Sequence, residues 1–225
     1  MPGTVKAKIK RNPQKTRASI LKAGVKLFSR RGYDGVAVDE IVQLAGVNKR
    51  MLYHYYGNKD GLYVEVLRVV FAELESLEIA VLTEDVSTAD AIRKVLKEYF
   101  DFLEGHPEFV SLLMWENLNR GRFLDMHPNL LSKSKVLARL REIVARARAA
   151  EEIDQDVDAR HLLVLLYGAC FIYQSNRFTL RHTMELDCRH PTVLRDGLRL
   201  AQNIIVRGLL SPALVDGRMP DTCTK

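Results

Sequence analysis

The chain has 225 residues, of which 47% are hydrophobic and 28% charged, a composition typical of a globular protein that can bury a sizeable core. Its net charge of +6 is unevenly distributed. Residues 1–60 contain 13 Lys and Arg against 4 Asp and Glu, a net charge of +9, whereas the other residues carry 21 and 24, a net charge of −3. This asymmetry indicates that the N-terminal end meets a polyanion, either nucleic acid or an anionic membrane surface.

The longest apolar stretch argues against a membrane-spanning helix. It covers residues 162–173, and these 12 residues fall short of the roughly 20 needed to cross a bilayer. No apolar segment of the signal-peptide type follows the basic start of the chain, so the sequence predicts a cytoplasmic protein. Cys170, Cys188 and Cys223 are too widely spaced for a disulfide framework or a zinc site.

Apolar residues recur with helical spacing from residue 14 to residue 210, and no stretch alternates as a strand would, so the predicted fold class is all-α. The first helix has Ile20 and Phe28 on one apolar face and ends at Gly32. A basic arm, residues 1–13, precedes it. This arm is either a disordered solubilising tail or a segment that follows DNA phosphates. The cations of the arm and of the start of the helix are Lys6, Lys8, Lys10, Arg11, Lys15 and Arg17.

Two short helices follow, and a glycine joins them. The first covers Val38 to Ala45, about two turns, and Gly46 closes it. Asn48 can cap the second, which covers Lys49 to Tyr56, because its side-chain oxygen can accept a free amide of the first turn. Two short helices joined by a tight turn form a helix-turn-helix, in which the second helix enters the major groove of DNA.

The second of these short helices has two chemically different faces. Successive residues are about 100° apart around a helix, which places cations and hydroxyls on one face and Leu52 and Tyr56 on the other. Major-groove recognition needs this combination of an exposed donor face and an apolar anchor. Lys59 begins the next helix, where free amides and the helix dipole favour a phosphate. The candidate DNA contacts are Lys49, Arg50, Tyr53, His54 and Lys59.

Six longer helices are predicted after this motif, which gives about nine helices in all. Pro107 suits a first helical turn, and Gly105 and Gly121 mark breaks between helices. The longer helices are expected over residues 59–83, 88–104, 107–119, 129–150, 158–181 and 192–210.

Five spaced elements occur together within residues 14–65: Gly32-Tyr33-Asp34, Val38-Asp39-Glu40-Ile41, Ala45-Gly46-Val47, Leu52-Tyr53-His54-Tyr55-Tyr56 and Asn58-Lys59-Asp60-Gly61-Leu62. This set closely resembles the DNA-binding signature of the tetracycline-repressor (TetR) family. The resemblance implies a three-helix DNA-binding domain, a larger helical domain for ligand binding and dimerisation, and palindromic operators. Position by position, it places the five candidate contacts on DNA, with Lys59 on a phosphate.

Ala37 departs from the family pattern, which has Thr or Ser at this position. Alanine cannot cap the helix that follows, so the resemblance does not supply the phosphate contact that a hydroxyl would make there. Further along, residues 106–109 and 115–117, followed by Ser175 and Asn176, are similar to the C-terminal domains of RutR-type regulators. This second similarity does not identify a ligand.

The resemblance divides the chain into a DNA-binding domain at residues 14–60 and a ligand-binding and dimerisation domain at residues 61–210. Residues 211–225 are rich in Pro, Gly and Asp, which predicts a flexible tail. Aromatic and amide side chains on the middle and late helices could enclose an apolar pocket with a few polar anchors. Plain core packing is the alternative for each of them. The candidate ligand contacts are Met114, Trp115, Asn117, Tyr167, Phe171 and Gln174.

The last two predicted helices are long and strongly apolar for elements at the end of a chain. They could form a helix–helix seam shared between two subunits, or they could pack within the core of one. The candidate seam residues are Leu162, Leu165, Leu166, Ala169 and Ile172 on one helix, and Val193, Leu200, Ile204 and Leu209 on the other.

The sequence therefore predicts a ligand-responsive transcriptional repressor that binds a palindromic DNA operator as a homodimer and is released by a small-molecule effector. A non-specific architectural DNA-binding protein is the first alternative, and an all-helical enzyme is the second. The six histidines form no HExxH pattern, and the sequence has neither a phosphate-binding glycine loop nor a nucleophile elbow. No catalytic residue, cofactor or metal site is predicted.

Overall fold

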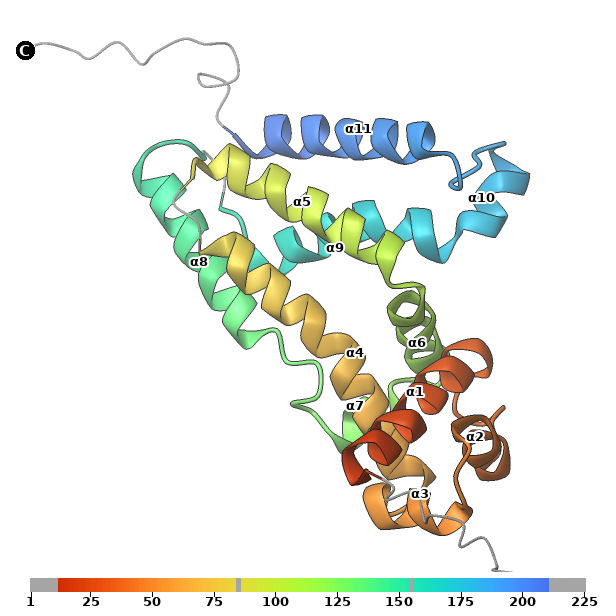
Figure 1. Ribbon diagram of the computed structural model, residues 1–225. Helices are drawn as coiled ribbons and strands as arrows, with labels where there is room; N and C mark the ends of the chain where they lie inside the picture. The colour runs from red at the N-terminus through yellow and green to blue at the C-terminus, as the bar shows by residue number, and fades with distance from the viewer. Residues whose placement is uncertain (1–11, 84–85, 154–155, 211–225) are drawn as a thin grey trace, which may run out of the picture.

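The computed structural model describes residues 12–83, 86–153 and 156–210, and all the regular secondary structure among them is helical (Figure 1). The predicted all-α fold class is confirmed. Residues 1–11 of the predicted basic arm and the predicted tail, residues 211–225, lie outside the described residues.

Three helices form the N-terminal part: α1 (Pro13–Arg31), α2 (Val38–Ala45) and α3 (Lys49–Tyr56). Gly46 ends α2 in the left-handed conformation, with φ 66° and ψ 35°, which glycine adopts without a steric penalty. Asn48 caps α3, because its side-chain oxygen accepts the backbone N–H of Met51 at 3.1 Å. The helix-turn-helix predicted from these local signals is present with the expected bounds.

Helix α4 (Lys59–Leu82) connects the N-terminal helices to the rest of the molecule. Asn58 caps it by accepting the N–H of Gly61 at 2.7 Å. The first turns of α4 pack closely on α1, since a Cβ atom on Gly24 would lie 3.1 Å from Val66 and 3.4 Å from Leu62. The helix then continues without a break into the larger domain.

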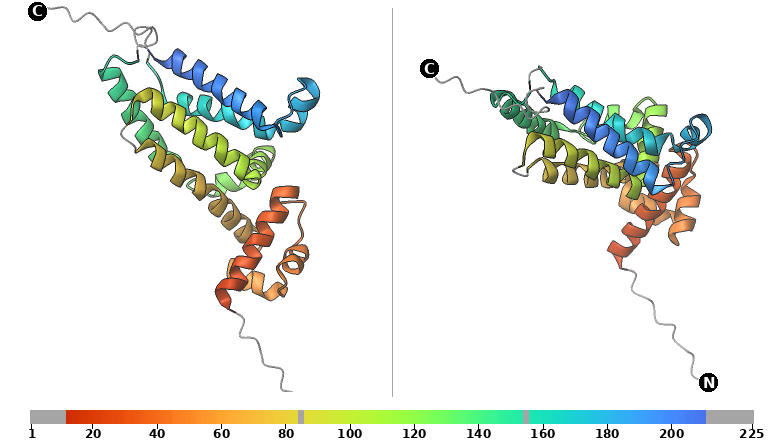
Figure 2. Two further views of the ribbon diagram at one scale, coloured as in Figure 1. Left: turned by 45° about the horizontal axis from the view of Figure 1, so that its top comes forward. Right: turned by 90° about the horizontal axis from the view of Figure 1, so that it is seen from above.

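The larger domain stacks the remaining helices on the far part of α4. In Figure 1, α8 lies beside α4, whereas α5 and α9 form the middle of the domain. Helix α11 lies at the end opposite α1–α3, and the tilted view of Figure 2 shows the same separation. Their bounds are α5 (Thr88–Gly105), α6 (Pro107–Leu118), α7 (Arg122–Met126), α8 (Ser134–Ala149), α9 (Ala159–Ser175), α10 (Arg177–Thr183) and α11 (Pro191–Leu209).

The described residues contain eleven helices rather than about nine, because two short helices were not predicted. Helix α7 has five residues, too few for a helical period, and it follows a turn in which Arg120 and Gly121 have positive φ. The helix predicted over residues 158–181 is broken at Asn176, whose φ of −109° and ψ of 13° are not helical, so α10 is separate from α9. The Asn176 side chain accepts a hydrogen bond from the Ser175 hydroxyl at this break.

The helix predicted to begin at residue 129 begins at Ser134 instead. Residues 127–131 form turns, and the N–H of Leu130 donates to the carbonyl of His127 at 2.9 Å. Leu130 and Leu131 are half-buried and pack against the core. The contacts of these two leucines with the core accompany the turns that precede α8.

Candidate DNA-binding surface and ligand cavity

Four of the five predicted DNA contacts, Lys49, Arg50, Tyr53 and His54, are exposed together on α3. The opposite face of the helix is anchored in the core by Leu52 and Tyr56. The Tyr56 hydroxyl also donates to the carbonyl of Arg17 on α1 at 2.8 Å, which fixes the end of α3 against α1. The helix therefore presents cations and hydrogen-bond donors on a firmly held backbone.

Lys49 is held in an exposed ion pair across the helix-turn-helix. Its ammonium lies 3.0 Å from a carboxylate oxygen of Asp39 on α2, and this hydrogen bond raises the pKa of Lys49. Exposed pairs of this kind contribute little stability, because water and salt screen the two charges. Lys49 can therefore exchange Asp39 for a DNA phosphate or base at small cost.

Lys59 has a different environment from the four residues on α3. It is half-buried at the start of α4, and its ammonium lies 4.0 Å from the centre of the Tyr33 ring. Burial lowers the pKa of Lys59, and the charges of Asp34 and Asp60 oppose this shift. The guanidinium of Arg122, which lies 5.5 Å from the centre of the same ring, adds a smaller lowering. Tyr33 thus has a cation near it from each domain.

Tyr33 was not predicted as a functional residue, although it belongs to one of the spaced elements that carry the family resemblance. Its hydroxyl donates to Asp60, and its ring lies 4.7 Å from that of Phe123 on α7. Burial, followed by the bond to Asp60, raises the pKa of Tyr33 to about 12. Tyr33 therefore connects the start of α4 to a helix of the larger domain.

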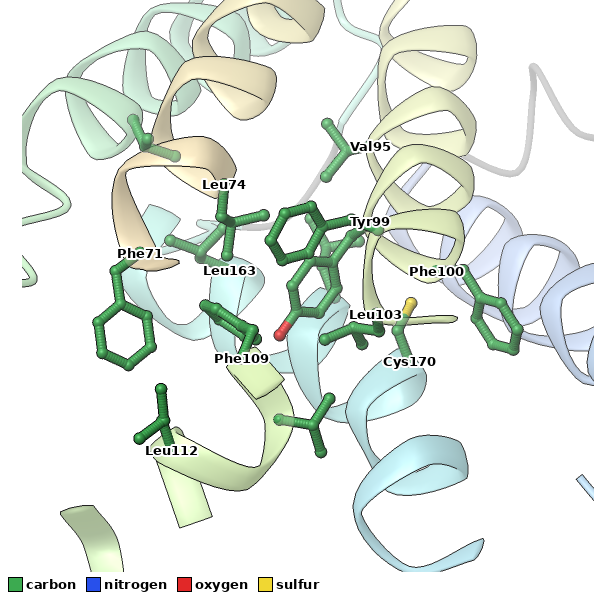
Figure 3. Close-up of a cluster of buried hydrophobic side chains, with 14 of the residues drawn as sticks. Phe71, Leu74, Val95, Tyr99, Phe100, Leu103, Phe109, Leu112, Leu163 and Cys170 are labelled. Carbon is green, nitrogen blue, oxygen red and sulfur yellow. The ribbon is translucent and has the colours of Figure 1, made fainter. Parts of the chain in front are cut away.

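A cavity of about 450 Å³ lies in the larger domain, between α4, α5, α6, α9 and the segment before α8. Figure 3 shows Phe71, Leu74, Tyr99 and Phe109 converging on this region from α4, α5 and α6. The apolar and aromatic lining residues are Phe71, Ala72, Leu74, Tyr99, Phe109, Leu113, Leu130, Leu131 and Tyr167, and the polar ones are Arg68, Glu75, Asn129, Ser132 and Lys133.

Tyr167 is the one residue among the six predicted ligand contacts that lines this cavity. Trp115 lies between the two domains instead, where its indole N–H donates to the carbonyl of Ser29 at 3.2 Å. Met114 and Asn117 are exposed on α6, and the Asn117 amide donates to its own helix at Leu113. The remaining two predicted contacts, Phe171 and Gln174, are half-buried on α9.

A buried polar cluster that was not predicted from the sequence joins two residues of the cavity lining, Lys133 and Tyr167, to Glu78. Glu78 is only 3% exposed, and its two carboxylate oxygens accept from the Lys133 ammonium and from the Tyr167 hydroxyl. Burial raises the pKa of Glu78, and the charge of Lys133 opposes this shift. The available signal was a carboxylate on the apolar face of α4, spaced three to four residues from Leu74 and Val81.

Helix α6 reaches from this cavity to the DNA-binding helices. Phe109 and Leu113 line the cavity, whereas Trp115, nearer the other end of α6, contacts α1 at Ser29. Glu116 is fully buried, and one of its oxygens accepts from the hydroxyl of Tyr63 on α4 at 2.8 Å. Helix α6 therefore joins the cavity lining to the contact with α1.

The predicted dimer seam separates into buried and exposed parts. Leu162, Leu166 and Leu209 are buried in the core, and Ala169 and Val193 are half-buried. Other apolar side chains of the seam face solvent, with Leu200 58% and Ile204 62% exposed on α11. Leu165 and Ile172 on α9 are exposed as well, and Val164 adds to them.

Two further observations concern the described residues alone. No helix among them is both long and apolar enough to span a membrane. Within the same residues, no three His, Cys, Asp or Glu side chains come together as metal ligands would. Cys170 and Cys188 are free and buried.

Two family models match this chain. The model for bacterial regulatory proteins of the tetR family matches residues 20–66, and the model for the tetracyclin repressor-like C-terminal domain matches residues 89–205. The first match covers the helix-turn-helix and the start of α4. The second runs from α5 into α11 and covers just over half of the chain.

Characterised regulators and solved structures agree with these models. The chain is 32% identical over 196 residues to the transcriptional repressor NicS of Pseudomonas putida, covering 87% of this chain and 92% of NicS. It is 23% identical over 197 residues to the transcriptional regulator RutR of Escherichia coli, covering 85% and 89%. Among solved structures, SCO4942 from Streptomyces coelicolor has a TM-score of 0.65 at 19% identity, and the match covers 84% of this chain and 97% of SCO4942. The hemolysin II regulator HlyIIR has a TM-score of 0.61 at 20% identity, and the match covers 89% of this chain and 99% of HlyIIR. This chain is therefore a transcriptional regulator and belongs to the TetR family.

Proposed function

We propose that this regulator is a repressor that binds a palindromic operator through α3. The observation that carries the proposal is the exposed face of α3, on which cations and hydroxyls are backed by the buried Leu52 and Tyr56. In the proposed complex Lys49, Arg50, Tyr53 and His54 contact the major groove, and Lys59 contacts a phosphate. Since operator DNA is in the cytoplasm of a bacterium, we place the regulator there.

The assignment is tested with an operator selected from random duplex DNA by the wild-type protein. Arg50→Ala should weaken operator binding by about 1–3 kcal/mol and should affect unrelated DNA much less. Lys59→Gln should weaken all sequences alike and lower the slope of log affinity against log salt by about one unit. Arg139→Ala, which removes an exposed cation on α8, is the matched control.

Fluorescence anisotropy measures both affinities. Unchanged operator affinity in both variants would contradict the assignment. Unrelated DNA that competes with the selected operator as well as the operator itself would instead favour an architectural DNA-binding protein.

The regulator is proposed to act as a homodimer, with a second copy covering the exposed apolar face of α9 and α11. Contiguous exposed apolar side chains mark interaction surfaces, and here they lie on the helices farthest from the DNA-binding surface. A twofold axis through this face would present two α3 helices to an inverted repeat. The double variant Leu200→Glu/Ile204→Glu should sediment as a monomer, while Leu118→Glu, at an exposed apolar site on α6, should remain a dimer. A wild-type monomer at micromolar concentration, free and on DNA, would refute the dimer.

The cavity is proposed to bind a small-molecule effector that lowers operator affinity. Helices α4 and α6 both line the cavity and both contact the DNA-binding helices, so a ligand that favours one arrangement of these helices would change the spacing of the two α3 helices. Coupling of this kind is typically about 1–3 kcal/mol. Metabolites are screened first for thermal stabilisation and then for operator release.

A variant that fills the cavity provides the decisive comparison. Leu113→Trp should abolish the response to a compound that releases the wild-type protein, and Leu118→Trp, on the exposed side of the same helix, should not. Bound compounds that leave operator affinity unchanged would contradict the proposal. Alanine variants of Met114, Trp115, Asn117, Phe171 and Gln174 in the same assay test the contacts predicted outside the cavity lining.

A further inference from the structure

The cavity contains a cation with unused hydrogen-bond donors. Lys133 lines it with its side chain 25% exposed, and the Lys133 ammonium lies 5.7 Å from the centre of the Tyr167 ring. An ammonium has three N–H donors, and the bond to Glu78 uses one of them. The other two donors are available to an acceptor in the cavity, and a partly buried ammonium gains most from an anionic acceptor.

The buried carboxylate beside the cavity, Glu78, is already paired. Glu78 accepts from Lys133 and from Tyr167 through different oxygens, and at 3% exposure it has little room for another donor. Glu75 lines the cavity but is 3.9 Å from the Lys135 ammonium. A cationic ligand at Glu78 would have to displace Lys133 or Tyr167, whereas an anionic ligand would use the free donors of Lys133.

Four aromatic side chains of the lining suit a flat ligand. Tyr99 and Tyr167 have ring centres 4.5 Å apart, and Phe71 and Phe109 have ring centres 5.0 Å apart in an edge-to-face arrangement. All four rings line the cavity. Its volume of about 450 Å³ lies near the lower end of the 300–1,000 Å³ usual for ligand sites, which favours a small molecule.

We propose that the cavity binds a small aromatic carboxylic acid, with the carboxylate on the Lys133 ammonium and the ring between the aromatic side chains. This inference rests on the proposed function, in which the same cavity is the effector site. It adds the chemical class of the effector and the residue that selects it.

Binding is measured by calorimetry on the full chain without DNA. The probes are benzoate, cinnamate and 2-naphthoate, their primary amides, and cyclohexanecarboxylate. At least one aromatic acid should bind, its amide should bind at least about tenfold more weakly because the charge-assisted bond to Lys133 is lost, and the cyclohexane acid should also bind more weakly. An amide as tight as its acid, a cyclohexane acid as tight as the best aromatic acid, or no binding by any of the acids would overturn the proposal.

Variants identify the residue responsible. Removing Lys133 alone would leave Glu78 buried without its ionic partner, so Lys133→Met is introduced together with Glu78→Gln and compared with Glu78→Gln alone. The double variant should bind the acid at least about tenfold more weakly than the single variant. Lys135→Met, which removes the neighbouring exposed ammonium, should bind it like the wild type. Equal affinity of the single and double variants for the acid would overturn the role of Lys133. If the double variant does not fold, the comparison of acid and amide on the wild type still tests the proposal.

Operator affinity in the presence of the same probes separates this inference from the proposed function. An acid that binds through Lys133 but leaves operator affinity unchanged supports the site and contradicts effector release. Operator release by a neutral compound, with no binding by any of the acids, supports effector release and overturns the acid.

Discussion

Gly32 ends α1 in a conformation that other residues rarely adopt, and it lies against Trp115 of α6. Its φ of 67° and ψ of −178° fall in a region that is essentially restricted to glycine, where another residue costs about 1–3 kcal/mol. A Cβ atom at this position would lie 2.8 Å from two ring carbons of Trp115, and overpacking of this kind costs a further 1–3 kcal/mol or so. Gly32→Ala should therefore lower the free energy of unfolding by about 2–6 kcal/mol.

Two comparisons separate the backbone strain from the clash. Gly46 also has a positive φ, but no atom lies within 4 Å of its Cβ position, so Gly46→Ala should cost only about 1–2 kcal/mol. In a Trp115→Ala background the clash is absent, and Gly32→Ala should then cost only the backbone contribution of about 1–3 kcal/mol. Urea denaturation, followed by far-UV circular dichroism at one fixed protein concentration, measures all the variants. The reasoning is refuted if Gly32→Ala costs no more than Gly46→Ala, or if its cost is the same with and without Trp115.

Two further predictions concern the N-terminal domain. Ala37 precedes α2 with an extended backbone but no side-chain cap, so Ala37→Ser should raise the free energy of unfolding by about 0.5–2 kcal/mol. Ala138→Ser, at an exposed position inside α8, should not raise it. Equal effects of the two substitutions in urea denaturation would argue against capping. The folded protein raises the pKa of Tyr33 from 10 to about 12, so this hydroxyl contributes stability that is complete below pH 10 and is lost as the pH rises towards 12. Melting temperatures across this interval should fall less steeply for Tyr33→Phe than for the wild type, and an equally steep fall would contradict this linkage.

The helix-turn-helix could be predicted because its boundaries depend on local chemistry. Gly46 permits the left-handed turn and Asn48 caps the following helix through a bond three residues away. The exposed face of α3 follows from the helical period once these ends are known. The late start of α8 could not be predicted in this way, since burial of Leu130 and Leu131 depends on helices distant in sequence.

The cavity was only partly predictable for the same reason. An aromatic residue on a helix in the middle of the chain is equally suited to a ligand site and to a domain interface, and Trp115 belongs to the interface. The buried polar cluster joins Glu78 to Lys133, which is 55 residues away, and to Tyr167, which is 89 residues away. The sequence contains each of these residues, but only the packing of α4 against α8 and α9 brings them together.

The close contact of Gly24 with Leu62 and Val66 determines where this protein could be recombined with a relative. A chimera joined at residue 60 would place α1 of one parent on α4 of the other, at a contact where even a methyl group on Gly24 would require its neighbours to move. A crossover after Leu67 keeps all three residues from one parent and places the junction about one helical turn before Phe71, the first aromatic residue of the cavity on α4. The specificity for DNA should therefore be transferred together with the first turns of α4, so that the aromatic lining of the cavity is inherited from the other parent.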